Sequence, residues 1–316
     1  MKSKQKQNLK KRTLFQSIIY ELKRNWSLYL LVSIPLIYLI LFKYVPMYGV
    51  QIAFKDYVPA KGITGSPWVG FKHFIKFMSN YKFKDIIWNT LSISLYQLCT
   101  FPLPIILALL LNYIKKEKFK KTVQMVSYAP HFISTVVMVG ILIQFLDARN
   151  GIINQIIELL GGEAQNFMAK KEYFRHIYVW SGVWQSIGYS SIIYIAALSG
   201  VSSELHEAAI IDGANILKRI WHVDLPSILP TIAILLIMQC GSILSVGYEK
   251  IYLMQNNLNL AQSEIISTYV YKQGIISAIP QYSYSTAIGL FVSVINVILL
   301  LITNKIVDKM TGNSLF

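Results

Sequence analysis

Residues 202–226 read SSELHEAAIIDGANILKRIWHVDLP, a polar stretch between two long apolar runs. Ser202 or Ser203 can cap a short helix whose first turns carry acidic residues, which favour the positive end of the helix dipole. Gly213 can take the positive φ that ends such a helix, and Pro226 stops a second segment before the next apolar run. The pattern predicts a short helix-turn-helix, a shape suited to docking in a groove of another protein.

Long apolar runs surround this stretch on both sides. Hydrophobic residues make up 54% of the 316-residue chain, charged residues only 14%, and the mean hydropathy is +0.47. A soluble protein needs more charge to cover its surface, and about 20 apolar residues cross a bilayer as a helix. The sequence predicts an all-α membrane protein with six transmembrane helices at Trp26–Phe42, Ile86–Ile114, Thr122–Leu146, Ile177–Gly200, Ile228–Tyr248 and Ser285–Ile306.

Basic residues indicate the orientation, because they gather in short cytoplasmic loops. With the N-terminus inside, 17 of the 30 lysines and arginines lie inside, five of them in the seven residues Lys115–Lys121. We expect a cytoplasmic basic segment 1–25, a transmembrane domain 26–306 that contains the loop 202–226, and a cytoplasmic tail 307–316. The net charge of +15 then reflects cytoplasmic loops and anionic membrane lipid, and no nucleic-acid partner is expected.

Ionisable groups are missing from the predicted spans. All fifteen acidic residues lie outside the five longer spans, whereas proton relays and sodium sites need charges at membrane depth. His131 lies near that depth beside Pro130, where we expect freed backbone carbonyls to satisfy it. No phosphate-binding loop, metal-ligand cluster or nucleophile-base pair occurs in the sequence, so we expect no enzyme, no metal site and no cofactor bound by this chain.

The stretch quoted above also resembles a known motif. Glu207-Ala208-Ala209, then Gly213, then nine residues and Val223-Asp224-Leu225-Pro226, is similar to the EAA motif of permease subunits in binding-protein-dependent ABC importers. The consensus of that motif has Ile where this chain has Val223. Seven fixed positions at fixed spacing in a loop before the penultimate span make the resemblance specific.

The resemblance extends over nearly the whole chain. It is to the LplB-type branch of these permeases, which takes up oligosaccharides or polysaccharide fragments. The segments that carry it are Tyr48–Tyr57, Trp68–Phe71, Phe101–Pro104, Tyr128–Ser134 and Gln281–Ser283. It implies the type I importer (MetI-like) fold, with a core of five helices after an extra first helix, in the plasma membrane of a bacterium. It also implies a second permease subunit, two ATPase subunits that bind ATP and Mg, and an extracellular solute-binding lipoprotein.

The resemblance implies a coupling helix at the inner surface. Glu207 should face a basic residue of the ATPase subunit, and Ala208, Ala209 and Gly213 should let the helix lie close in its cleft. Plain helix propensity explains the alanines equally well, and a helix C-cap explains Gly213. The residues assigned to coupling are Glu204, Glu207, Ala208, Ala209, Asp212, Gly213, Leu225 and Pro226.

Polar side chains within two predicted spans mark a candidate sugar pathway. Gln185, Ser186 and Tyr189 lie close together on the fourth span, and Gln239, Ser242 and Ser245 recur every three residues on the fifth. Polar groups at that depth face a cavity or the protein interior. Hydrogen bonding between helices explains the same residues equally well.

Two rival functions stay open. A self-sufficient channel or secondary carrier is disfavoured by the uncharged spans, and a permease for amino acids or peptides would share the EAA motif. The sequence does not name the sugar. The predicted outer segments carry 13 basic and 8 acidic residues, a balance that suits acidic glycans.

Overall fold

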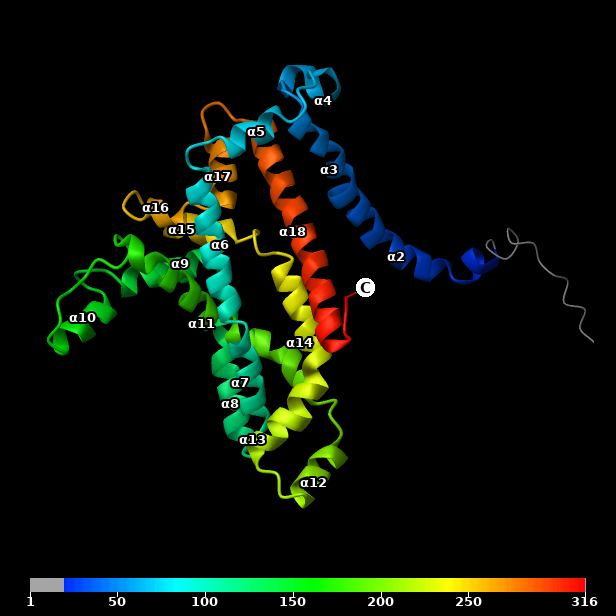
Figure 1. Ribbon diagram of the computed structural model, residues 1–316, viewed down its shortest axis with the longest axis vertical. Helices are drawn as coiled ribbons and strands as arrows, with labels where there is room; N and C mark the ends of the chain where they lie inside the picture. The colour runs from blue at the N-terminus through cyan, green and yellow to red at the C-terminus, as the bar shows by residue number, and fades with distance from the viewer. Residues whose placement is uncertain (1–19, 316) are drawn as a thin grey trace, which may run out of the picture.

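The computed structural model describes residues 20–315, so most of the predicted segment 1–25 lies outside the described residues. Within residues 20–315 the chain forms helices and no strand; a single isolated bridge joins Lys55 and Trp68. The helices build an elongated bundle in which α6, α14 and α18 run along the long axis (Figure 1). The all-α prediction is confirmed.

Ten helical segments and their connecting turns form the body of the bundle. Their bounds are α6 (Phe83–Cys99), α7 (Pro102–Asn112), α8 (Glu117–Tyr128), η4 (Ala129–Phe132), α9 (Thr135–Phe145), α11 (Lys171–Leu198), α13 (Ile216–Arg219), η5 (Ile220–Asp224), α14 (Leu225–Cys240) and α18 (Tyr282–Thr311). Helix α12 (Ser203–Ile211) lies at the lower end in Figure 1.

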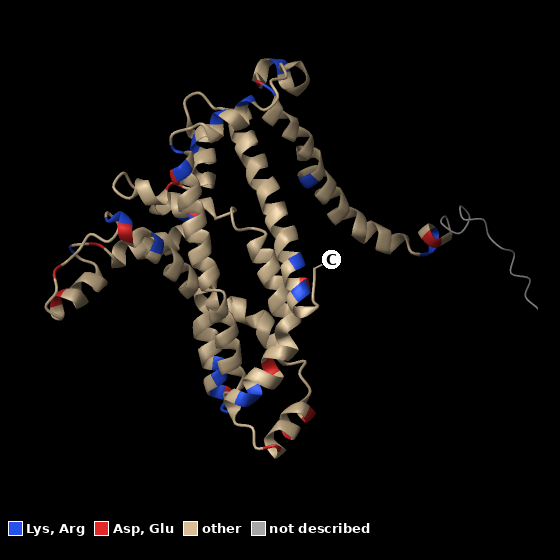
Figure 2. Cartoon of the chain, viewed as in Figure 1, with Lys and Arg blue, Asp and Glu red and all other residues tan. Residues whose placement is uncertain are grey.

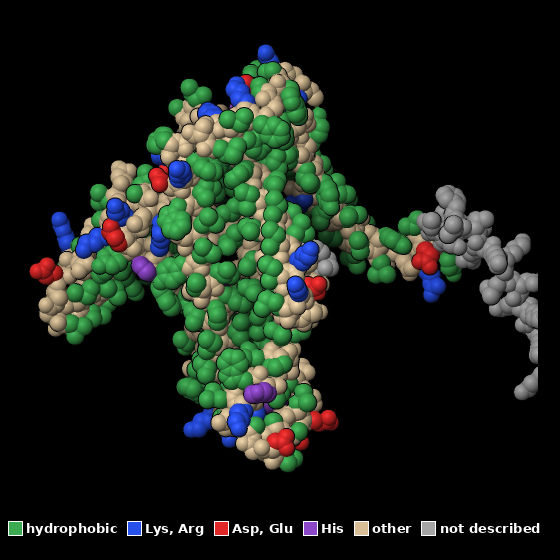
Figure 3. Space-filling view, in the orientation of Figure 1, with side chains coloured by type: hydrophobic (Ala, Val, Ile, Leu, Met, Phe, Trp, Pro, Cys, Tyr) green, Lys and Arg blue, Asp and Glu red, His purple; other side chains and the backbone are tan. Residues whose placement is uncertain are grey.

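Four of the described helical stretches are long and apolar enough to cross a membrane. They are Trp26–Phe54, Phe83–Asn112, Ile216–Cys240 and Tyr282–Thr311. Each overlaps a predicted span. Apolar side chains cover most of the middle of the molecule, while charges gather at its ends, in its outer lobes and at the C-terminal end of α18 (Figures 2 and 3). The chain therefore passes through the membrane several times.

The predicted crossing Thr122–Leu146 is not one helix. Helices α8 and η4 meet α9 at a bend of 101°. Pro130 has no backbone N–H, and Ser134 caps the new helix by accepting a hydrogen bond from the Val137 N–H at 3.4 Å. The freed carbonyl of Ile133 accepts a hydrogen bond from Gln185 Nε2 at 2.8 Å, so the bend leaves this oxygen paired.

The predicted crossing Ile228–Tyr248 also ends early, because α14 stops at Cys240. Gly241 lies so close to α18 that a Cβ there would come within 2.7 Å of Leu300 Cδ1. Asn296 of α18 then holds the turn, accepting from the Leu244 N–H at 3.1 Å and donating to Ser245 Oγ at 2.8 Å. A side chain of a neighbouring helix thus replaces the helical hydrogen bonds that end there.

The predicted crossing Ile177–Gly200 corresponds to α11, a helix of 28 residues. It is long enough to span a bilayer, but it begins with the charged residues Lys171, Glu172 and Arg175 and is not among the four most apolar helices. It packs against α7, α8 and α14 in the centre of the bundle. The count of six crossings stays a prediction.

Short helices cover the upper end of the bundle and form a lobe at its side, which contains α10 (Figure 1). Their bounds are η2 (Tyr48–Phe54), η3 (Pro59–Lys61), α4 (Gly62–Gly65), α5 (Lys72–Met78), α10 (Ile152–Leu159), α15 (Tyr248–Met254), α16 (Leu260–Ser263), α17 (Ile266–Tyr271) and η6 (Lys272–Ile276). An apolar cluster that includes Phe77, Ile86, Tyr269 and Tyr284 joins α5, α6, α17 and α18. Parts of the predicted outer segments 43–85 and 249–284 therefore fold as a cap over the helix ends, whereas α10 of segment 147–176 lies in the side lobe.

The first described crossing stands apart from the bundle. It comprises α2 (Trp26–Leu39), the π-helical turn η1 (Ile40–Tyr44) and α3 (Val45–Met47), and α2 has no buried residue. It diverges from the other helices below the upper cap (Figure 1). Only its continuation η2 packs against α18.

Close approach of α8 and α11 depends on Gly188, because a Cβ at this position would overlap the backbone of Ser127. We expect Gly188→Ala to destabilise the protein by about 1–3 kcal/mol through overpacking. The matched control is Gly289→Ala in α18, where a Cβ meets nothing within 4 Å. Thermal unfolding of the purified protein in detergent tests this: equal apparent Tm values for both variants would contradict the packing argument.

Candidate functional site

The loop 202–226 folds as the helix-turn-helix that its sequence predicts. Ser202 Oγ accepts a hydrogen bond from the Glu204 N–H at 3.2 Å and caps α12. Gly213 has φ +73°, a conformation that favours glycine, and ends the helix. Asn215 Oδ1 then accepts from the Lys218 N–H at 2.9 Å and caps α13.

Helix α12 presents an open surface. It has no buried residue, and its apolar side chains Leu205, Ile210 and Ile211 are 52%, 55% and 85% exposed. Of the residues predicted to couple, Ala209 and Leu225 are half-buried, and the exposed ones are Glu204, Glu207, Ala208, Asp212, Gly213 and Pro226. Exposed Ile and Leu beside small and acidic residues favour contact with another protein.

Asp224 ties this exposed helix to the bundle. Its side chain is fully buried, and its Oδ2 accepts a hydrogen bond from the Tyr113 hydroxyl at 2.6 Å. The His206 Nε2 of α12 lies 3.3 Å from the other carboxylate oxygen, Oδ1. The Arg219 guanidinium lies over the Tyr113 ring, 5.3 Å from its centre. Three elements, α7, α12 and the start of α14, therefore meet at one buried carboxylate.

No role was predicted from the sequence for Tyr113, His206 or Asp224. The sequence did contain one indication of this cluster. Asp224 directly precedes an apolar run, where burial of a carboxylate without a partner would be unfavourable. Its partners could not be found from spacing, because Tyr113 is 111 residues away along the chain.

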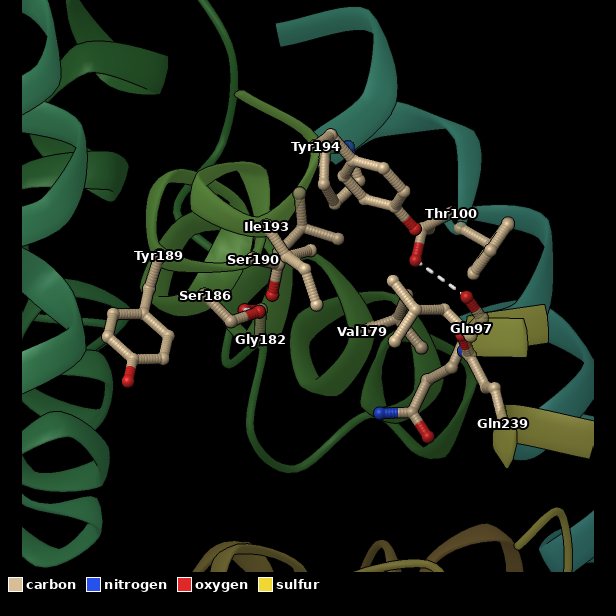
Figure 4. Close-up of a pocket in the computed structure, with 14 residues that line it drawn as sticks. Gln97, Thr100, Val179, Gly182, Ser186, Tyr189, Ser190, Ile193, Tyr194 and Gln239 are labelled. Carbon is tan, nitrogen blue, oxygen red and sulfur yellow. Dashed lines mark hydrogen bonds between the residues drawn. The ribbon is translucent and has the colours of Figure 1, made fainter. Parts of the chain in front are cut away.

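A cavity of about 520 Å³ lies between α6, α7, α11 and α14. Three predicted pathway residues, Ser186, Tyr189 and Gln239, line it. Figure 4 shows Ser186, Ser190 and Gln97 around the cavity, with Thr100 donating a hydrogen bond to the Gln97 carbonyl at 2.7 Å. A volume of this size is typical of small-molecule sites.

A second cavity of about 200 Å³ adjoins the first. Gln97 and Gln239 line both cavities, and Ser242 and Ser245 line the second. Because α14 ends at Cys240, the two serines project from the turn that follows and not from the helical stripe that the sequence predicted. The helical stripe predicted for them is therefore absent, and their role in a sugar pathway stays a prediction.

Gln185 lines neither cavity, since its amide is used at the Ile133 carbonyl. Gln97 and Ser94 of α6, by contrast, were not predicted, and their only signal was polarity within the second apolar run. Tyr189 stacks on His131 with ring centres 3.7 Å apart and planes 2° apart. The His131 ring thus packs on an aromatic face in place of the expected backbone carbonyls.

None of the residues that line the two cavities is charged. Within residues 20–315 no group of three His, Cys, Asp or Glu side chains could hold a metal ion. The lining amides and hydroxyls can instead donate to and accept from the hydroxyl groups of an uncharged polar ligand.

Removal of the Asp224 carboxylate tests its role as the anchor of α12. We expect Asp224→Ala to lower the free energy of unfolding by about 1–3 kcal/mol, because Tyr113 loses a buried partner, and to speed amide hydrogen exchange in residues 203–211. Asp308→Ala removes an exposed carboxylate from α18 and should change neither quantity. Unchanged exchange in α12 of Asp224→Ala would contradict the anchor.

Comparison with known proteins identifies the family. Residues 100–312 match the model of the binding-protein-dependent transport system inner membrane component. Protein LplB of Bacillus subtilis (strain 168) is 45% identical over 93% of this chain and 92% of its own. The polygalacturonan/rhamnogalacturonan transport system permease protein YteP of the same organism is 43% identical over 92% of this chain and 91% of its own.

Solved structures agree with these relatives. A bacterial ABC transporter involved in the import of the acidic polysaccharide alginate contains a chain with a TM-score of 0.85 and 36% identity, covering 93% of this chain and 99% of that one. The same TM-score is found for the alginate transporter in complex with an alginate pentasaccharide-bound periplasmic protein, at 35% identity over 94% and 99% of the two chains. The chain therefore belongs to the inner membrane components of binding-protein-dependent transport systems, with the MetI-like permease fold.

Proposed function

We propose that this chain is a permease subunit of an ATP-driven importer for oligosaccharides or polysaccharide fragments. The observation that carries the proposal is the covalent continuity between the exposed α12, its anchor Asp224, and α14, whose Gln239 lines both cavities. A displacement of α12 would thereby move α14, a helix that lines the cavities. The named relatives YteP and the alginate transporter support a saccharide as the substrate.

The proposed topology has six crossings with both termini in the cytoplasm. Four apolar helices, the bent pair α8–α9 and the long α11 account for the six. The basic segment Lys115–Lys121 and α12 lie at the same, lower end of the molecule (Figure 2). A lysine-rich short loop favours the cytoplasmic side, so α12 would face the cytoplasm.

The proposed assembly contains a second permease, two ATPase subunits that bind ATP and Mg, and an extracellular solute-binding lipoprotein. The exposed apolar residues of α12 support an ATPase contact, because Ile211 is 85% exposed at the tip of the helix. The binding-protein complex of the alginate transporter supports the extracellular partner. Glu207 would pair with a basic residue of the ATPase.

The proposed mechanism is alternating access. Closure of the ATPase pair on ATP moves α12, and the Asp224 cluster passes this motion to α7 and α14 together. Both helices line the larger cavity, α7 through Pro104 and α14 through Leu235 and Gln239. The cavity would then open to the outside, where the binding protein delivers sugar, and hydrolysis would reset it.

A secondary carrier is the weaker candidate, because the residues that line the cavities offer no charge to couple to a proton or sodium ion. An amino-acid or peptide permease would share the loop but not the saccharide relatives.

A large side chain introduced on the exposed face of α12 tests coupling to the ATPase without affecting the stability of the fold. Ala208 is exposed, so we expect Ala208→Trp to leave the apparent Tm unchanged yet lower ATP-driven uptake roughly tenfold or more, because a large side chain cannot enter a close interface. Ala208→Ser adds one small group and should keep uptake near that of the wild type. The assay is saccharide uptake by the reconstituted complex with ATP; full uptake by Ala208→Trp would show that α12 does not dock.

A further inference from the structure

Lys250 lines neither cavity, but its ammonium group lies against one lining residue of each, Tyr178 and Gly182. It lies on α15, outside the four apolar spans, and its Nζ donates to the Tyr178 carbonyl of α11 at 3.1 Å. The same Nζ lies 5.0 Å from the centre of the Tyr178 ring. Tyr178 lines the smaller cavity. One turn further along α11, a Cβ at Gly182 would lie 3.5 Å from this Nζ, and Gly182 lines the larger cavity.

Three lysines of the upper end pair with a carboxylate, whereas this amine, like Lys55 and Lys76, has no acidic partner in the part of the chain that the structure describes. Lys72 pairs with Asp56 at 2.6 Å, and Lys82 and Lys272 pair with Glu264 at 2.9 Å and 3.5 Å. No carboxylate of residues 20–315 lies within 4.0 Å of Lys250 Nζ. Of its three donors, the described part of the chain uses one, at the Tyr178 carbonyl.

Burial makes the absence of a counter-ion for the Lys250 ammonium group unfavourable in free energy. Burial lowers the pKa of Lys250 to about 8, so the amine still carries its charge at neutral pH. A half-buried charge without a counter-ion is destabilising, and an anionic ligand at the cavity would relieve it. The lining of the cavities, by contrast, consists of neutral amides, hydroxyls and apolar groups, which suit the sugar ring and its hydroxyls but not a carboxylate.

We propose that Lys250 is a specificity-determining residue whose ammonium group binds the carboxylates of an acidic oligosaccharide, one that contains uronic acids, as it passes the two cavities. The inference rests on the proposed function and adds to it the charge of the substrate. Gln97 and Gln239, which line both cavities, would bind the neutral hydroxyls of the same sugar. The excess of basic over acidic residues in the outer segments favours the same class of substrate.

The test uses the complete complex in proteoliposomes with its binding protein, and trigalacturonate as the acidic probe. We expect Lys250→Met to lower uptake of subsaturating trigalacturonate roughly tenfold, the effect of losing one charged hydrogen bond. Lys250→Arg keeps the charge and should restore most of the uptake. The matched control is Lys171→Met, which removes an exposed lysine at the start of α11 and should leave uptake unchanged.

The outcomes separate this inference from the proposed function. If Lys250→Met imports trigalacturonate like the wild type, or if Lys250→Arg fails as badly as Lys250→Met, the amine does not recognise charge and the inference is wrong. If the wild type imports a neutral oligosaccharide such as maltotriose but no trigalacturonate, the inference fails while the importer function stands. If it imports neither, both fail. Basal ATP hydrolysis by each variant complex shows that assembly is intact.

Discussion

Backbone polar groups at membrane depth must find hydrogen-bond partners inside the protein, and this requirement governs where the helices can break. Within residues 20–315, the predicted crossings Thr122–Leu146 and Ile228–Tyr248 break after Pro130 and after Cys240, and at each of these breaks a neighbouring helix supplies an amide side chain. Gln185 of α11 donates to the Ile133 carbonyl, and Asn296 of α18 accepts from the Leu244 N–H. The second break lies beside the cavities and presents Ser242 and Ser245 to them. A polar pathway can therefore form without an unpaired backbone group at these sites.

The cavities and the exposed helix α12 are parts of one mechanical unit. Helix α14 begins directly after the buried Asp224 and carries Gln239 near its other end. The Tyr113 hydrogen bond fixes the end of α7 to the same carboxylate. A displacement of α12 would thus reach two cavity-lining helices through one shared contact.

Local sequence patterns predicted which helices form more accurately than they predicted where each helix ends. Capping residues and Gly213 located α12 and α13, and apolar runs located the helices of the bundle. The breaks at Pro130 and Gly241 were missed because tertiary partners, not the apolar runs themselves, decide whether a helix can stop there. Gln185 and Gln239 were both predicted to line the pathway, because the sequence does not show which amide faces a cavity. In the structure Gln239 lines both cavities, whereas Gln185 donates a hydrogen bond to the backbone carbonyl freed at the Pro130 break. The Asp224 cluster joins residues too distant in sequence for any spacing rule.

The most direct measurement of the central claim, that motion enters through α12, is photo-cross-linking from the helix tip. A photoreactive residue at Ile211, which is 85% exposed, would be compared with one at Leu159, equally exposed on α10, which lies in a lobe at the side of the molecule away from α12 (Figure 1). The account predicts a cross-link from Ile211 to an ATPase subunit that changes in yield when ATP is added, and none to that subunit from Leu159. No ATPase cross-link from Ile211 in a complex that still imports saccharide on ATP would contradict it.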